Sequence, residues 1–355
     1  MTVPAAYDNS PRTDRDVQPA TASFELSQLA RALPRNLRLG TVGWYRPNWR
    51  GTVYDSFVGD RPDWFRMYAA YVGHPLFRAT EWVLPRQRAT EEKSWQRMAL
   101  MTPEDFSLFI RFSGRLTDPV LRQRRGAAAG ENPEFLSFSL AEKTVLGPIE
   151  RQFATGVAGV ILDLLYDPRR DAYRPAHRKA LYERLSAFLS SWREREGAPR
   201  LFVNVRAPML QTPALMKLLA AGGAVPSLTL SATGPSLSAQ LRSWSFYETL
   251  VPRPGPLVIR WLGSQLPSYF RGKSSGNDVV TSTRLAYAAV AAMEAGQSVV
   301  FLADEGAEGD APASVEAFAR TVRTRRQALL AQEAERLSAL PPELPPLTGG
   351  RSTQK

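Results

Sequence analysis

The chain has 355 residues, 44% of them hydrophobic, and its 45 Lys and Arg against 34 Asp and Glu give a formal net charge of +11. This length and apolar content suffice for one large folded core and exclude an intrinsically disordered chain. The sequence contains no cysteine, which excludes disulfides, thiolate metal sites and a cysteine nucleophile.

His74 and His177 are the only histidines, so imidazole metal sites and a histidine-based triad have little to draw on. A carboxylate-only magnesium or calcium site stays open. The basic charge makes nucleic acid a possible partner, although an arginine-rich composition alone produces the same excess. No apolar run approaches the ~20 residues of a membrane span, and no signal peptide is recognisable, so we expect a cytoplasmic protein without a membrane partner.

The two ends of the chain have the composition of tails. Residues 1–22 are polar and dotted with proline, which predicts disorder, and Ser23–Leu33 has the spacing of a short amphipathic helix capped by Ser23. These residues make up an N-terminal tail, 1–36. The run Pro341–Pro346 is expected to stop the last helix, within a disordered Pro-rich tail at 338–355.

Between the tails, apolar runs alternate with amphipathic helical patterns. The fold class is therefore α/β, and eight such units over residues 37–337 predict a single (β/α)8 TIM-like barrel. A doubly wound open sheet is the competitor, but the Gly-rich fingerprint of a dinucleotide fold is missing after the first strand. The expected strands are Leu37–Val42, Phe77–Trp82, Phe106–Phe112, Val157–Leu164, Arg200–Arg206, Pro226–Ser231, Leu257–Leu262 and Ser298–Asp304.

Three segments between these elements read as loops. Arg122–Pro133 is expected to be a mobile insertion, and Gly263–Asn277 is a second flexible loop that would close as a lid or stay disordered. The segment Asp167–Lys179, which contains His177, is strongly basic and would steer an anion or stay solvated.

The stretch Leu37–Asp55 is rich in aromatic residues. Gly40 and Gly43 allow a close backbone approach and a sharp exit from the first strand. Trp44, Tyr45 and Trp49 follow in a loop beside two arginines, a combination that suits planar, sugar-like or anionic ligands. The alternative is that the tryptophans only plug the mouth of the fold.

Polar residues occupy the ends of most predicted strands, which is where TIM barrels carry their active sites. Three arginines would clamp an anion and two carboxylates would serve as acid or base, or the same residues would pair as a purely structural network. The candidate catalytic residues are Glu81 and Asp163; the candidate ligand-binding residues are Trp44, Tyr45, Trp49, Arg111, Asn204, Arg206, Arg260 and Asp304; no metal ligand is predicted.

Several motifs together resemble those of the YecE-like family (domain of unknown function 72). They are Gly40-Thr-Val-Gly-Trp44 followed by Trp49-Arg-Gly51, then Glu81, then Trp95 with Thr102-Pro-Glu-Asp-Phe106, then Arg260-Trp-Leu-Gly263 and Gly309-Asp-Ala-Pro312. The resemblance implies a TIM-barrel-like fold and no established activity.

The chain departs from the family pattern at several polar positions. Arg111 stands where the family usually has lysine, Asn204 replaces a glutamate, and Leu262 replaces a histidine. Asp163 and Asp304 also lie in altered strand ends. The chain therefore has the motifs of the family scaffold, but only about half of the polar residues that the family carries at its strand ends.

Three functional hypotheses remain. The leading one is a barrel that binds a small anionic ligand, phosphate-bearing or nucleotide-like, with hydrolysis or phosphodiester chemistry as the reaction class to test first. The others are a non-catalytic binding barrel and a nucleic-acid binder that works through its basic surface. No cofactor is indicated by any motif.

Overall fold

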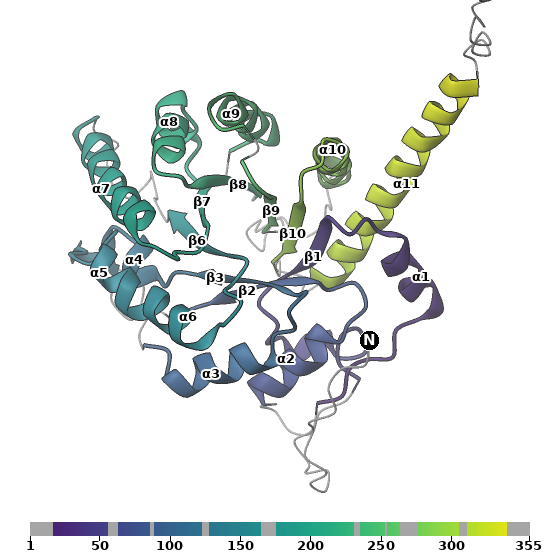
Figure 1. Cartoon of the computed structure of the whole chain (residues 1–355), viewed down its shortest axis with the longest axis horizontal. Helices are drawn as coiled ribbons and strands as arrows, with labels where there is room; N and C mark the ends of the chain where they lie inside the picture. Colours follow the sequence, from purple (N-terminus) through teal and green to yellow (C-terminus); the bar gives the residue numbers. More distant parts are fainter. Residues whose placement is uncertain are drawn as a thin grey trace, which may run out of the picture.

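The structure is a computed structural model, and it describes residues 17–55, 63–85, 89–122, 128–164, 175–230, 235–252, 254–262, 276–304 and 311–338. Eight parallel strands form a closed barrel in the order β1-β10-β9-β8-β7-β6-β3-β2 (Figure 1). The barrel strands are β1 (Leu37–Val42), β2 (Ala79–Val83), β3 (Ser107–Arg111), β6 (Gly159–Leu164), β7 (Leu201–Val205), β8 (Val225–Leu230), β9 (Leu257–Trp261) and β10 (Val299–Ala303).

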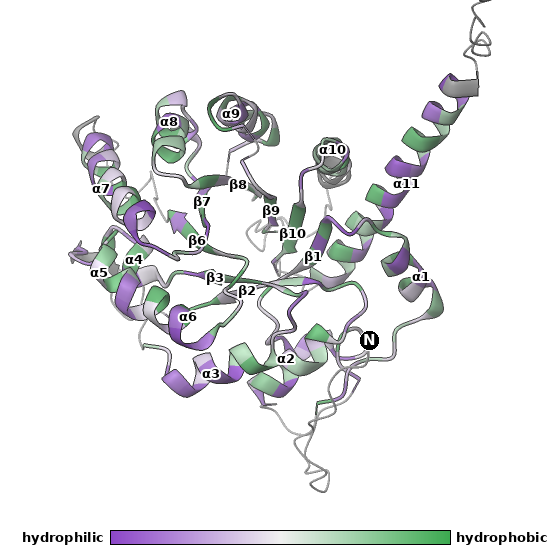
Figure 2. Ribbon diagram, viewed as in Figure 1, coloured by the Kyte–Doolittle hydropathy of each residue, from purple (hydrophilic) through white to green (hydrophobic). Residues whose placement is uncertain are grey.

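Helices follow the strands and surround the barrel (Figure 1). They are α2 (Trp64–Val72), α3 (Glu92–Met101), α4 (Gly114–Thr117), α5 (Phe138–Ala141), the π-helical turn η2 (Glu142–Leu146), α6 (Gly147–Gln152), α7 (Pro175–Glu194), α8 (Pro213–Ala221), α9 (Leu237–Leu250), α10 (Gly276–Glu294) and α11 (Ala311–Ser338). Figure 2 shows hydrophilic and hydrophobic residues alternating along α7 and α11. This (β/α)8 barrel confirms the predicted fold class.

Closure of the barrel joins the first strand to the last. β1 pairs with β10 from Leu37↔Val299 to Thr41↔Ala303, and with β2 from Gly40↔Ala79 to Val42↔Glu81. A Cβ atom on Gly40 would lie 1.7 Å from the Ala79 carbonyl oxygen, so only glycine permits this strand spacing. Gly43 then turns the chain with a φ of 75°. Both glycines do what the sequence predicted.

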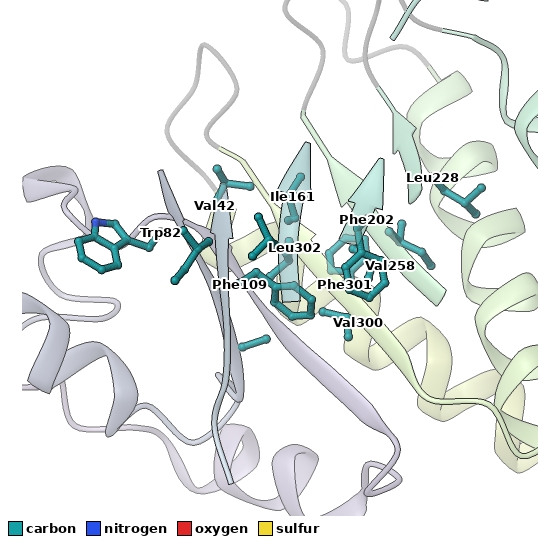
Figure 3. Close-up of a cluster of buried hydrophobic side chains, with 14 of the residues drawn as sticks. Val42, Trp82, Phe109, Ile161, Phe202, Leu228, Val258, Val300, Phe301 and Leu302 are labelled. Carbon is teal, nitrogen blue, oxygen red and sulfur yellow. The ribbon is translucent and has the colours of Figure 1, made fainter. Parts of the chain in front are cut away.

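Apolar side chains from all the barrel strands are buried in one cluster, part of which Figure 3 shows. Phe109 and Phe202 meet edge to face with ring centroids 5.6 Å apart, and both are buried. On the outer side of β10, Phe301 stacks on Phe318 of α11 at 3.9 Å. Burial of apolar side chains on both faces explains why the parallel strands read as nearly continuous hydrophobic runs.

Part of the predicted N-terminal tail packs against the barrel. Val17 is buried, and the Ala20 amide donates to the Val53 carbonyl at 2.9 Å, so residues 17–20 pack against the loop after β1. Helix α1 (Phe24–Ala32) follows, with the Ser23 hydroxyl accepting from the Leu26 amide, as the sequence predicted. The rest of the predicted N-terminal disorder, and the C-terminal tail from 339, lie outside the described residues.

Several elements were not predicted, among them helices α4 and α9 and the strands β4 (Val120–Arg122) and β5 (Ala128–Glu131). Helix α9 follows β8 and is amphipathic only weakly, because polar and apolar residues are mixed around it. Strand β5 lies in the predicted insertion Arg122–Pro133 and pairs antiparallel with β4, which begins two residues before the insertion. Within the described part of the chain, no helix combines the length and apolar character needed to cross a membrane.

Candidate active site at the carboxyl end of the barrel

The polar residues predicted at the strand ends do come together. Glu81 lies on β2, Arg111 ends β3, and Asp163 lies near the end of β6. Asn204 lies on β7 with Arg206 just after it, Arg260 lies on β9, and Asp304 follows β10. Their side chains form the layer above the apolar interior because the carboxyl ends of parallel strands share one end of the barrel.

Glu81 and Arg260 form the centre of this layer. The Arg260 Nε donates to Glu81 Oε2 at 2.7 Å and its Nη2 donates to Oε1 at 2.9 Å, while both residues are fully buried. Arg111 adds a second contact, with its Nε 2.8 Å from Glu81 Oε1. Burial by itself would lower the pKa of Arg260. The negative charges of Glu81 and Asp163 outweigh burial and raise that pKa above its usual value. Arg260 therefore stays protonated beside Glu81.

Asp163 is the second hub. Its Oδ2 lies 2.8 Å from Arg206 Nη2, 3.0 Å from Arg111 Nη1 and 3.8 Å from Arg260 Nη1. Burial alone would raise its pKa, but the charges of these arginines outweigh burial and hold the pKa below the usual value. Arginines thus hold both oxygens of Glu81 and the Oδ2 atom of Asp163. The structure supports the pairing network that the sequence left as an alternative.

Five polar atoms of this layer make no hydrogen bond among the described residues: Asp163 Oδ1, Asn204 Nδ2, Arg206 Nε, Arg260 Nη1 and Arg111 Nε, the last of which still forms its ion pair with Glu81. Asn204 is completely buried, and its Oδ1 accepts from the hydroxyls of Ser227 and Thr229 on β8. Asp163 and Asn204 are register partners on the neighbouring strands β6 and β7. Arg206 and Arg260 also contact Asp163, so the groups without a hydrogen bond lie around the Asp163 carboxylate. Unmet buried polar groups cost free energy and are characteristic of functional sites.

Asp304 differs from the other two carboxylates. Burial and the negative charge of Glu81 raise its pKa above the usual value, against the opposing charges of Arg260, Arg111 and Arg46. Its Oδ1 lies 3.8 Å from Arg46 Nη2, and about a fifth of its side chain is accessible (21%). It is therefore the carboxylate of this layer best suited to hold a proton near the surface.

A pocket of about 280 Å³ opens beside Asp304. Arg111 lies in its wall, with 19% of its side chain exposed, so this arginine belongs both to the pocket and to the buried ion-pair network. The lining consists of Val42, Gly43, Trp44, Tyr45, Arg46, Trp64, Trp82, Val83, Arg111 and Asp304.

The aromatic residues of the first loop separate into two groups. Trp44 and Tyr45 line the pocket. The Trp44 indole donates to the Trp64 carbonyl at 3.2 Å, and the ring centroids of Trp44 and Trp64 lie 4.6 Å apart. Trp49 does not line the pocket. It is 2% exposed and packs between Tyr54 and Tyr71, with ring centroids 6.5 and 6.4 Å away, so it fills the structural role that the sequence left open.

Sequence reasoning missed part of the lining. Arg46 and Trp82 line the pocket but were not predicted to do so. Each directly follows a predicted site residue, Tyr45 and Glu81, and this position in the sequence could have identified them. Trp64 gave no comparable signal, because it begins α2 and reads as part of an amphipathic helix. Trp64 reaches the pocket only through the packing of α2 in the folded protein.

Several predicted features cannot be placed. The basic segment up to residue 174 and the loop at 263–275 lie outside the described residues, as does the side chain of His177. His74 is buried and stacks on Phe77 at 4.0 Å in the turn before β2, away from the pocket, and burial lowers its pKa to about 4. Among the described residues, no group of three His, Asp or Glu side chains is placed to hold a metal.

The chain is similar to several solved structures. A DUF72 family protein from Thermotoga maritima MSB8 superposes with a TM-score of 0.52 and 14% identity, over 81% of this chain and 98% of that one. A DUF72 family protein from Enterococcus faecalis V583 gives 0.49 and 10%, over 81% and 94%. A psychrophilic glycoside hydrolase family 10 endo-beta-1,4-xylanase gives 0.42 and 11%, over 79% and 88%.

No curated protein matches the chain significantly. The family model described as protein of unknown function DUF72 matches residues 38–339, which include all of the barrel except Leu37 and the whole of α11. This match confirms the resemblance drawn from the aromatic strand end, Glu81 and the Arg260 segment. The chain is a member of the DUF72 family.

Proposed function

We propose that the pocket at the carboxyl end of the barrel binds a small ligand through an anionic group. The observation that carries this proposal is the position of Arg111, which reaches from the buried carboxylates into the wall of the pocket and keeps an exposed edge there. Arginine presents several donors in a planar fork that matches a carboxylate or phosphate.

The charge balance supports an anion. Among the described residues of the polar layer and pocket, the arginines are Arg46, Arg111, Arg206 and Arg260, and the carboxylates are Glu81, Asp163 and Asp304. The layer thus holds one positive charge in excess, and a proton on Asp304 would add another. Positive potential in a concave, partly dry site concentrates anions.

Any proton transfer in the pocket falls to Asp304. Glu81 and Asp163 were the predicted acid–base pair, but arginines hold both oxygens of Glu81 and the Oδ2 atom of Asp163, and almost no solvent reaches either residue. Asp304 lines the pocket and has a raised pKa, the combination required of a general acid. A hydrolytic reaction on the bound anion would use this residue, and Asp304→Asn would abolish turnover while retaining binding.

The proposal is tested by thermal unfolding and titration calorimetry with inorganic phosphate, acetate and AMP. A ligand at a hundredfold excess over its Kd should stabilise the protein by about 2.7 kcal/mol. We expect Arg46→Gln and Arg111→Gln to weaken binding at least tenfold. Arg38→Gln is the matched control, since this arginine lies on β1 and bonds the Asp105 carbonyl at the other end of the barrel.

Arg111→Gln also removes a partner of two buried carboxylates, so its own stability must be measured without ligand. Arg46→Gln serves as the second test because its contact to Asp304 is long, at 3.8 Å. Binding that survives both changes, or that appears only with long polyanions, would overturn the pocket proposal in favour of a basic-surface interaction.

A further inference from the structure

The pocket contains features that select among anionic ligands. We infer that its ligand is an acidic monosaccharide unit, a single hydroxylated saturated ring that carries one carboxylate or phosphate group. This inference rests on the proposed anion site and adds the chemistry of the rest of the ligand. It draws on the size of the pocket, the geometry of its aromatic rings and the position of Asp304.

Size sets the first limit. The pocket measures about 280 Å³, just below the ~300–1,000 Å³ typical of sites for larger organic ligands. One ring with its substituents fills such a volume. A base, a ribose and a phosphate together would have to extend out of the pocket, past Val83, which is 39% exposed at its rim.

The aromatic wall provides single faces and no slot. Trp44 and Trp64 are inclined at 49°, and Trp64 and Trp82 at 48°. A flat base is held best between parallel faces, which none of these pairs offers. A saturated ring needs only one aromatic face, because its C–H groups carry slight positive charge and the face of an aromatic ring is negative.

Burial identifies which rings can offer that face. Trp44 and Trp82 are nearly inaccessible, at 1% and 4% exposure, and support the wall from behind. Tyr45 and Trp64 are only partly buried and keep accessible surface at the pocket. Trp64 is also braced by the edge of Phe65 at 4.7 Å and an 88° angle, so the platform is held in place before a ligand arrives.

The polar groups divide the pocket by function. Arg46 and Arg111 provide the donors for the anionic substituent, while the Asp304 carboxylate is the acceptor that ring hydroxyls require. A hydroxylated ring brings hydrogen-bond donors for Asp304, which a bare anion lacks. A neutral sugar would leave the arginine donors without an anion.

Titration calorimetry can test the ligand class with defined probes: glucuronate, galacturonate, glucose 6-phosphate, glucose, acetate, inorganic phosphate and AMP. We expect at least one acidic sugar to bind ten or more times tighter than glucose and than the matching bare anion. Comparison of the uronates with the sugar phosphate distinguishes a carboxylate from a phosphate substituent.

The variants Trp64→Leu and Tyr45→Ala test the ring platform. They should weaken the acidic sugar at least tenfold and leave the affinity for inorganic phosphate within twofold. Leu330→Ala on the exposed end of α11 is the control for an apolar surface change elsewhere. A folded Trp64→Leu protein that binds the acidic sugar as tightly as wild type would contradict the inference.

The results separate the two proposals. Arginine-dependent binding of phosphate or acetate that is not improved by a sugar ring would overturn the sugar assignment and leave the anion site standing. AMP binding tighter than every acidic sugar would do the same and favour a nucleotide. No binding of any probe would overturn both.

Discussion

Arg260 on β9 and Glu81 on β2 are completely buried and joined by two hydrogen bonds across the barrel interior, at 2.7 and 2.9 Å. The two strands are not neighbours in the barrel order. The attraction between two buried charges offsets their loss of hydration only while both partners are present. It therefore fixes the polar layer more strictly than any contact at the surface.

Removal of one partner is expected to be costly. Glu81→Leu leaves Arg260 with a buried, uncompensated charge, and we expect a loss of roughly 3–5 kcal/mol in the free energy of unfolding. Urea denaturation measures this loss. The double variant Glu81→Leu/Arg260→Leu should recover part of it, and failure to recover any would contradict the pairing argument. Glu92→Gln, in the exposed pair with Arg151, should cost less than about 1 kcal/mol.

Asp163 and Asp304 should make the stability of the protein depend on pH in opposite directions. The folded-state pKa of Asp163 is lowered, so its contribution is present above the unfolded value of 3.8 and is lost as pH falls from there through the folded value. Asp163→Asn should thus destabilise the protein at neutral pH and less so in acid. Denaturation midpoints from pH 7 down to pH 3 would show the difference narrowing.

For Asp304 the sign is reversed. Its folded-state pKa is raised, so the folded protein binds the proton more tightly, and stability falls as pH rises from 3.8 through the folded value. Asp304→Asn removes this penalty and should stabilise the protein at neutral pH, with the gain vanishing in acid. Carbon-13 NMR of the carboxyl group measures the pKa directly, and a value at or below 3.8 would contradict the assignment.

Trp49 should behave as a core residue. Its ring is buried, and its indole N–H has no hydrogen-bond partner among the described residues. Trp49→Phe should cost no more than about 1.5 kcal/mol, since it keeps an aromatic ring and removes an unmet donor, whereas Trp49→Ala should cost roughly 3–5 kcal/mol. Both folded variants should bind glucuronate or phosphate like wild type. A tenfold weakening would return Trp49 to the binding site.

Gly40 should tolerate no side chain. Gly40→Ala places a methyl group against the Ala79 backbone and must push β1 away from β2, so we expect a loss of at least 1–3 kcal/mol. Gly73→Ala is the matched control, because its Cβ would meet only ordinary contacts at 3.4 Å and its φ is −77°. Equal stability of the two variants, compared by thermal unfolding, would rule out this packing argument.

The barrel could be predicted because its strands are buried on both faces and read as separate apolar runs. The first, Leu37–Val42, agrees residue for residue, and the others differ at their ends by two residues or fewer. Helix α9 was missed because Gln240 is turned inward to bond the Thr229 backbone, which breaks the apolar stripe expected of a core-facing helix.

The members of the polar layer were predictable, but their partners were not. Position at a strand end is enough to identify Asp163 and Arg111, whereas their contact depends on the β3–β6 register and on side-chain reach. The same limit applies to tryptophans. Nothing in the composition of the first loop distinguishes Trp44, which lies at the pocket, from Trp49, which lies behind it.

The bond between Glu81 and Arg260 also bears on the order of folding, because the two residues are 179 positions apart in the chain. Contacts over such a separation carry a high loop-closure entropy and form after more local ones. The pair can assemble only once β2 and β9 have both docked. Changes to it should therefore act mainly on the unfolding rate, and the ion pair would serve as a latch that prolongs the lifetime of the closed barrel.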